Sequence, residues 1–347
     1  MAGKSTLVSE RKEEHIELCL TDKVSFKEKS NGFEHYDFLH YAITEVDLKS
    51  ISFETSFLKK KVNYPFLISC MTGGTKSAER INAKLALAAN DLNIPLGVGS
   101  QRQALENKDH HNSYKVIRKN APSIPILGNL GAAQFVLVEK TDTIEELIDM
   151  IEADALVIHV NPLQELLQKN GEPSFTGLLR KLEKLINKIS VPVIVKEVGA
   201  GISGRAAEKL LSAGVKGIDV AGAGGTSWSG VEILRSGKKG NNLLWDWGLP
   251  TSYCIKDVSK LKKKYKFTLI GSGGINSAAE AAKALALGAD IIASARIILQ
   301  ELDKNDVEGV RDLIEGWFEV VRDIMFLTGS QKLTELRNKI IPKEKLY

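Results

Sequence analysis

The chain has 347 residues, a formal net charge of +4 and a hydrophobic fraction of 43%, enough for one large barrel or two ordinary domains. The weak positive balance, with aromatic residues at only 6%, argues against nucleic-acid binding. Three scattered cysteines argue against a disulfide scaffold or a thiolate zinc site, and the lack of a long apolar run or a signal-peptide core predicts a cytoplasmic protein without a membrane span.

Eight short apolar runs alternate with helix-length segments, after an N-terminal region in which residues 11–20 are predicted to be helical. The predicted strands are residues 65–69, 94–98, 124–127, 155–159, 191–196, 217–221, 267–270 and 290–293. The main predicted helices are residues 78–90, 143–151, 175–189, 203–213 and 277–287. This alternation predicts a parallel sheet buried on both faces. Eight strands favour a closed (β/α)₈ TIM barrel over the alternative, an open doubly wound sheet.

The repeat predicts a single domain, residues 1–347, with three parts. Residues 1–63 form an N-terminal extension, residues 64–328 the barrel, and residues 329–347 a charged tail. Residues 222–250 are predicted to form a long loop, containing glycine and tryptophan, after the sixth strand. Loops of this length inside a compact domain are usually functional.

Polar, small or cationic residues follow almost every predicted strand, and in a barrel the chemistry lies where strands end. Lys196 closes the fifth strand, where its ammonium can stabilise negative charge on a ring. Glycine turns at residues 222–226 and 271–275 follow the sixth and seventh strands and offer bare amides to a phosphate. His159 closes the fourth strand, where a core residue with satisfied hydrogen bonds is an equal alternative. These positions predict a phosphorylated cofactor with a ring system.

A second group of residues is suited to another anion. Ser100 and Arg102 follow the second strand, and arginine binds phosphate through paired hydrogen bonds. Arg11 and His15 are four residues apart, so on a helix they share a face and can converge on one phosphate. Glu165 follows the fourth strand as a single carboxylate, of the kind that holds a partly hydrated Mg²⁺. Each residue also has an ordinary explanation, such as a solvated helix face or an acid in a helix's first turn.

The order of these motifs resembles one known family, the type 2 isopentenyl diphosphate isomerases, which are flavin-dependent (β/α)₈ barrels. The resemblance covers most of the chain, from Arg11 to Arg296. It rests on the motifs RKEEH, MTGG, GVGSQR, GNLGAAQ, HVNPLQE, VIVKEVG, GAGGTSW, GSGGI and SAR, in the family's order. HVNPLQE, SQR and GAGGTSW are highly specific, whereas GSGGI occurs in many phosphate-binding barrels.

The resemblance implies a role for each candidate residue. Residues implied to bind the substrate are Arg11, Lys12, Ser100, Gln101, Arg102 and Gln164. Glu165 is implied to hold Mg²⁺, and Lys196, Gln164 and His159 to take part in catalysis. Residues implied to contact FMN are Met71, Thr72, Gly73, Ser100, Asn129, Lys196, Thr226, Gly273, Gly274, Ala295 and Arg296.

The implied reaction converts isopentenyl diphosphate to dimethylallyl diphosphate, with reduced FMN as the acid and base that moves the proton. NADPH is implied as the reductant, and a tetramer or octamer as the assembly. The chain departs from the family pattern at Ala221, where many members have serine. That serine's contact is therefore in doubt here.

Three alternative functions stay open for this sequence. An FMN-dependent 2-hydroxy acid oxidase on the same barrel carries His-Gly-Gly-Arg after its sixth strand, where this chain has Ala223 to Thr226. An inosine monophosphate dehydrogenase needs a nucleophilic loop cysteine, and Cys254 is the only candidate near that loop. A non-catalytic flavin or phosphate carrier has no use for the motifs RKEEH, SQR and QE together.

Overall fold

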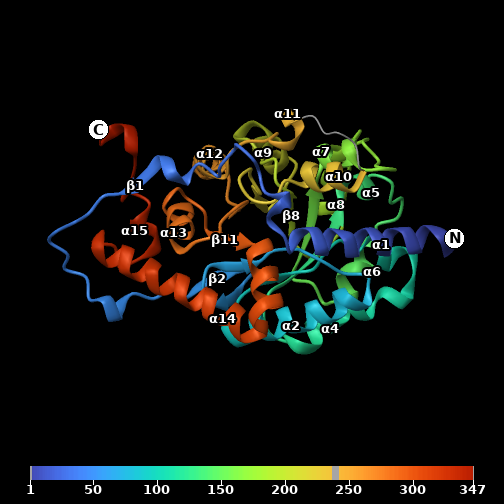
Figure 1. The fold of residues 1–347 in the computed structure, drawn as a ribbon, viewed down its shortest axis with the longest axis horizontal. Coiled ribbons are helices and arrows are strands. Elements are labelled where there is room, and N and C mark those ends of the chain that lie inside the picture. The colour runs from blue at the N-terminus through green and yellow to red at the C-terminus, as the bar shows by residue number, and fades with distance from the viewer. Residues whose placement is uncertain (1, 237–241, 347) are drawn as a thin grey trace.

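The computed structural model describes residues 2–236 and 242–346. Over these residues the chain folds around a closed barrel of eight parallel strands (Figure 1). In chain order the barrel strands are β4 (Phe66–Ile68), β5 (Leu96–Gly97), β6 (Ile126–Gly131), β7 (Ala155–Val160), β8 (Val193–Glu197), β9 (Gly217–Asp219), β10 (Thr268–Ser272) and β11 (Ile291–Ser294). β11 pairs with β4 and closes the ring. The predicted (β/α)₈ barrel is confirmed.

The continuous apolar runs reflect strands that are buried on both faces. Leu67, Leu127, Ile194 and Ile270 pack together inside the barrel. Their neighbours in sequence belong to the larger core between the strands and the surrounding helices, because successive side chains of a strand point to opposite faces.

Helices cover the outside of the barrel between consecutive strands. They are α2 (Lys76–Leu92), α4 (Asn112–Asn120), α6 (Asp142–Met150), α8 (Leu178–Ile186), α9 (Gly204–Ser212), α12 (Thr251–Ser259), α13 (Ala278–Ala286) and α14 (Arg296–Leu327). Shorter helices follow several strands: α3 (Arg102–Glu106), α5 (Ala132–Phe135) and α7 (Pro162–Leu167). Side chains of Thr75, Ser203 and Ser277 cap α2, α9 and α13, which satisfies amides that the helix itself leaves free.

The segment after β9 differs from the prediction of a long loop. It contains α10 (Trp228–Ser236) and α11 (Asn242–Trp245), while residues 237–241 of that loop lie outside the described residues. The tail contains α15 (Leu333–Leu336) and β12 (Ile340–Pro342). β12 pairs antiparallel with β1 (Tyr36–Phe38), so the tail joins the N-terminal extension. The division into extension, barrel and tail of one domain stays a prediction.

The N-terminal helix α1 (Ala2–Cys19) extends the predicted helix toward the start of the chain. It packs against α3, α10 and α14, and Figure 1 shows the two chain ends at opposite ends of the long axis. Among the described residues, no helix combines the length and the apolar character needed to cross a membrane.

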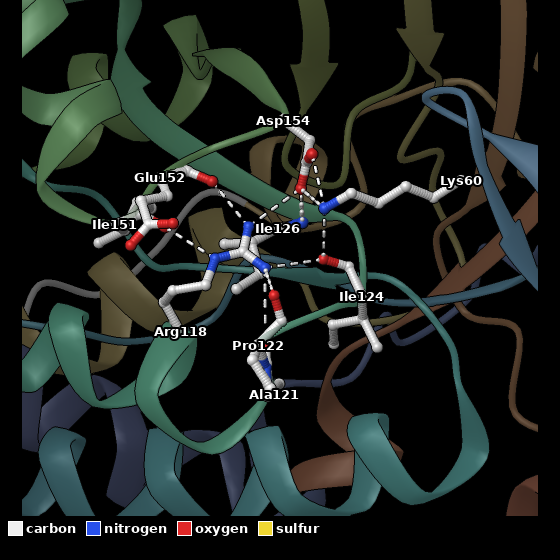
Figure 2. Close-up of polar contacts among 9 residues, drawn as sticks. All are labelled: Lys60, Arg118, Ala121, Pro122, Ile124, Ile126, Ile151, Glu152 and Asp154. Carbon is white, nitrogen blue, oxygen red and sulfur yellow. Dashed lines mark hydrogen bonds and ion pairs between the residues drawn. The ribbon is translucent and has the colours of Figure 1, made fainter.

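A hairpin of β2 (Thr55–Phe57) and β3 (Lys60–Val62) closes the amino-terminal end of the barrel. Its side chains Phe57 and Val62 are buried with the barrel interior. Lys60 extends from the hairpin to Asp154, which precedes β7, at 2.7 Å (Figure 2). The hairpin is therefore held by both apolar packing and a charged contact.

Asp154 is the centre of a polar cluster that Figure 2 shows. Its carboxylate accepts hydrogen bonds from the Ile126 amide at 2.9 Å and from Arg118 at 3.0 Å. Arg118 also donates to the carbonyl oxygens of Ile124 at 3.0 Å and Glu152 at 2.6 Å. One partly buried carboxylate thus fixes the starts of two barrel strands, the end of α4 and the hairpin.

Asp154→Ala is expected to lower the free energy of unfolding by about 3 kcal/mol, because it leaves two cations without their counter-charge. The side chain of Arg118 is only 11% exposed, so water cannot replace the lost carboxylate. The measurement is urea unfolding of the full chain. Glu54→Ala, which removes the exposed partner of Lys61 on the same hairpin, is the control and should change stability by less than about 1 kcal/mol. Equal losses of unfolding free energy in Asp154→Ala and Glu54→Ala would contradict the role of Asp154 as the centre of this cluster.

Candidate active site

A cavity of about 260 Å³ lies at the carboxyl ends of the barrel strands, beside α1. All but two of the residues predicted from the sequence line it. They are Arg11, Lys12, Met71, Thr72, Ser100, Arg102, Asn129, His159, Gln164, Glu165, Lys196, Thr226, Gly273, Gly274, Ala295 and Arg296. The barrel thus brings together residues separated by almost the whole length of the sequence.

Gln101 and Gly73 are the two predicted residues that do not line the cavity. The Gln101 side chain is fully buried. It donates to the Leu147 carbonyl at 2.9 Å and accepts from the Asn129 amide at 2.9 Å. Its hydrogen-bonding groups are used inside the protein, so Gln101 supports the backbone of Asn129. Gly73 lies against the Tyr114 ring, where no side chain fits, and its carbonyl oxygen accepts from Lys12.

One end of the cavity is suited to a phosphate. Helix α14, which is kinked at Asp306, begins after Ala295, which makes no side-chain cap, so its first amides are free for an anion. Gly273 and Gly274 have φ angles of +108° and +69°, and a side chain at Gly225 would meet the Gly274 amide nitrogen at 2.5 Å. Only glycine allows the two turns to pack so closely. This bare backbone fits the phosphate of a cofactor.

The floor of the cavity is polar. His159 Nδ1 donates to Asn129 Oδ1 at 2.9 Å, and Asn129 Nδ2 donates to the Val98 carbonyl at 3.1 Å. Burial, with the charges of Lys196 and Lys12, lowers the pKa of His159 to about 3. His159 is therefore neutral, with Nδ1 protonated and Nε2 left as an acceptor. The Lys196 ammonium donates to the Glu197 carbonyl at 2.6 Å, which leaves two of its protons for a ligand.

The wall of the cavity that α1 and α3 form is cationic. Arg11 and Lys12 come from α1, and Arg102 begins α3. Burial and the neighbouring Arg102 lower the pKa of Arg11, whose Nε is buried without a hydrogen-bond partner among the described residues. Burial and the charge of Arg11 lower the pKa of Lys12 to about 7. These side chains suit a multiply charged anion, and such an anion would favour the charged form of Lys12.

Comparison with known proteins agrees with this geometry. The chain is 43% identical, over 347 residues and 96% of each sequence, to a protein of Pelodictyon phaeoclathratiforme named isopentenyl-diphosphate delta-isomerase. The chain belongs to the isopentenyl-diphosphate delta-isomerase family. Relatives of the same name from Nostoc sp. and Vibrio parahaemolyticus are also 43% identical, over 96% and 94% of this chain and 95% and 96% of theirs. The resemblance noted from the motifs is confirmed.

A family model described as FMN-dependent dehydrogenase matches residues 132–343. Solved structures with a similar fold include a flavocytochrome b2 variant, with a TM-score of 0.67 and 19% identity over 92% of this chain and 80% of that one. A mandelate oxidase variant has a TM-score of 0.63 and 15% identity over 92% of both chains. At such identities the likeness shows only that this isomerase-family chain and these two proteins share a fold.

The end of β9 separates this chain from the oxidase pattern. Thr226 lines the cavity where that pattern has arginine, and Ala223 is fully buried where it has histidine. Ala221, where many isomerase-family members have serine, also lines the cavity and has a φ of +35°. A methyl group thus replaces a hydroxyl at this point of the wall.

Glu232, a buried carboxylate on α10 of this isomerase-family chain, was not predicted from the sequence. It accepts from His15 Nε2 at 3.1 Å, Gln164 Nε2 at 3.2 Å and Arg235 at 2.8 Å. Burial alone would raise its pKa, but the hydrogen bond from His15 and the adjacent charges lower it. The signal was its spacing of four residues from Trp228, which lines the cavity and packs edge-on against His15. That spacing went unread because the segment was predicted as a loop.

Glu165 lies in the first turn of α7 and is 5% exposed. One carboxylate oxygen accepts from Asn161 at 3.1 Å and the other from the Glu172 amide at 2.8 Å. Within residues 2–236 and 242–346, no group of three or more His, Cys, Asp or Glu residues could hold a metal ion. A cation held by Glu165 would need its other oxygen ligands from a bound molecule and from water. Mg²⁺ fits this description, because it usually keeps several water ligands.

Proposed function

We propose that this chain converts isopentenyl diphosphate to dimethylallyl diphosphate with the help of reduced FMN. The observation that carries the proposal is near full-length identity of 43% to relatives named for this reaction. The cavity supports it, because phosphate-binding backbone and a cationic wall lie at two places around one polar floor. A small-molecule substrate fits a cavity of this size.

The residues around the cavity suit both partners of the reaction. The phosphate of FMN would be held by the backbone of Gly273, Gly274 and Ala295, with Arg296 beside it. Asn129, Thr226, Lys196 and the segment of Met71, Thr72 and Gly73 would hold its ring. Arg11, Lys12, Ser100 and Arg102 would bind the diphosphate, with Gln101 holding Asn129 in place from behind the wall.

Reduced FMN supplies a ring nitrogen that can give a proton to an alkene carbon, chemistry that ordinary side chains perform poorly. Lys196 stabilises negative charge on the ring. Gln164 faces the cavity with its amide fixed, since Asn161 donates to its oxygen at 3.1 Å and its nitrogen donates to Glu232. Trp228 excludes water from developing positive charge on the substrate. Neutral His159 offers an acceptor nitrogen on the floor.

We also propose a metal ion, a reductant, a cellular location and an oligomeric assembly for this chain. Glu165 would hold Mg²⁺ together with oxygens of the diphosphate. NADPH would supply the electrons that first reduce FMN, with no net oxidation in the reaction itself. The chain would act in the cytoplasm as a homo-oligomer, a tetramer or an octamer.

The test uses the full chain purified, supplied with FMN, reduced anaerobically and given Mg²⁺ and isopentenyl diphosphate. Formation of dimethylallyl diphosphate, followed by NMR, is the expected result. A chain that binds FMN but leaves the alkene unchanged would be a carrier. Oxygen consumption with 2-hydroxy acids would identify an oxidase instead, and failure to bind FMN would overturn the proposal.

Diphosphate binding at pH 8 is expected to take up close to one proton at Lys12. In the free protein Lys12 has a pKa of about 7, so it is mostly neutral at pH 8, and a bound anion raises that pKa. Calorimetry with inorganic pyrophosphate in two buffers of different ionisation enthalpy measures the uptake.

Lys12→Arg is the matched control, because arginine keeps its charge at this pH. Its proton uptake should be lower than that of the wild type by nearly one proton, while the protonation of pyrophosphate itself is common to both. Equal uptake in the two proteins would mean that Lys12 is already charged before the ligand binds.

A further inference from the structure

A buried carboxylate that the proposed mechanism does not use lies in the top layer of the barrel interior. Asp219 ends β9 and is 2% exposed. It is the register partner of Lys196 on one side and of Ile270 on the other. Paired residues of parallel strands point to the same face of the sheet. Because Ile270 packs in the barrel interior, Asp219 and Lys196 also face inward, and Lys196 lines the cavity.

Burial opposes the ionised form of Asp219, and its polar neighbours offset part of this effect. The Ser272 hydroxyl, two residues beyond Ile270 on β10, donates to its Oδ1, and the Ala221 amide hydrogen-bonds to it. Burial raises the pKa of Asp219, and the Lys196 ammonium is the main group that opposes this rise. Two donors and a cation therefore surround one carboxylate.

Two titratable side chains that line the cavity also feel the charge of Lys196: His159, its register partner on β7, and Cys70. Burial raises the pKa of its thiol to about 12, and the charges of Lys196 and Asp219 act on it in opposite directions. Cys70 is therefore a neutral thiol, and the charge in this part of the floor comes from Lys196 and Asp219. No ion pair within 4.0 Å joins these two among the described residues, so they act on each other through space.

We propose that Asp219 is ionised in this pair and is a positioning residue that acts through Lys196, because its carboxylate offsets the charge that the ammonium would present to the cofactor ring. The inference rests on the proposed function, since it concerns how strongly the site favours a negatively charged reduced flavin over the neutral oxidised one. Lys196 draws negative charge to the ring, and Asp219 limits that attraction. The pair sets the balance between the two redox states.

Asp219→Asn keeps the shape of the side chain and removes its charge. It is expected to raise the preference of the site for reduced over oxidised FMN by about tenfold, which corresponds to an upward shift of about 30 mV in a two-electron midpoint potential. The measurement is anaerobic dye equilibration of the FMN-loaded full chain. A residue that merely supports the fold would alter stability and leave this potential unchanged.

Two further variants complete the test. Asp257 lies on α12, accepts a hydrogen bond from the Gly204 amide at 2.7 Å and does not line the cavity. Asp257→Asn should therefore leave the midpoint potential unchanged. Ser272→Ala removes one donor to Asp219, makes ionisation less favourable, and should shift the potential upward by less than Asp219→Asn does. If Asp219→Asn does not fold, the midpoint potential of Ser272→Ala tests the role of Asp219.

The outcomes separate this inference from the proposed function. If the wild-type chain takes up no FMN, both fail. If FMN is bound and the potentials of the Asp219 and Ser272 variants equal that of the wild type, only the role of Asp219 is overturned. An upward shift confined to these two variants supports it.

Discussion

Lys196→Met is expected to lower kcat by about a thousandfold, the effect of removing one electrostatic group aimed at developing charge. Methionine keeps much of the apolar length of lysine but cannot stabilise an anionic ring. The side chain lies at the end of β8, at the cavity floor, so its loss removes little core packing. Steady-state kinetics with saturating FMN and Mg²⁺, together with thermal unfolding, measure both effects.

Lys216→Met is the matched control for this substitution. Lys216 is exposed and immediately precedes β9, at the opposite end of the barrel from the cavity. The same chemical change there should leave kcat unaltered. A Lys196→Met protein that binds FMN and retains wild-type turnover would remove Lys196 from the mechanism.

Glu165→Gln is expected to raise the Mg²⁺ concentration for half-maximal activity by tenfold or more. The described residues offer no cluster of three potential ligand residues, so one carboxylate carries the protein's charge toward the cation. Glutamine keeps the size of the side chain but loses the negative charge, and Mg²⁺ binds carboxylates far better than neutral amides. A Mg²⁺ titration of initial rate is the measurement.

The control for this variant is Glu145→Gln, an exposed acid on α6, which should leave the Mg²⁺ titration unaltered. Wild-type protein should also bind Mg²⁺ only weakly until a diphosphate is present. Tight Mg²⁺ binding without any diphosphate, or an unchanged titration for Glu165→Gln, would mean that the cation binds elsewhere.

All eight barrel strands could be predicted because each is buried on both faces and therefore reads as an apolar run. Their boundaries were less predictable. β5 contains only Leu96 and Gly97, although the apolar run is longer, because strand pairing and not composition sets where a ladder ends. Residues at the strand ends could be predicted as site residues for the same reason, since the barrel brings those ends to one face.

The part of the site that does not come from strand ends was harder to predict. Gln101 follows a strand, yet its side chain turns into the core to bond Leu147, and only tertiary packing decides that direction. Glu232 approaches Gln164 through α10, and its spacing from Trp228 places it on one helix face without indicating this distant partner. The contact of α1 with the cavity is also long-range, although the charged face of Arg11 and His15 indicated it.

The pairing of β1 with β12 links residues 36–38 to residues 340–342. On the ribosome, residues 36–38 therefore wait without this partner until residues 340–342 have been synthesised, and β4 likewise waits for β11. A nascent chain exposes two open strand edges during this interval, and such edges invite pairing with other chains. Premature termination before β12 should thus yield a product that needs chaperones, even though every side chain proposed for catalysis is present.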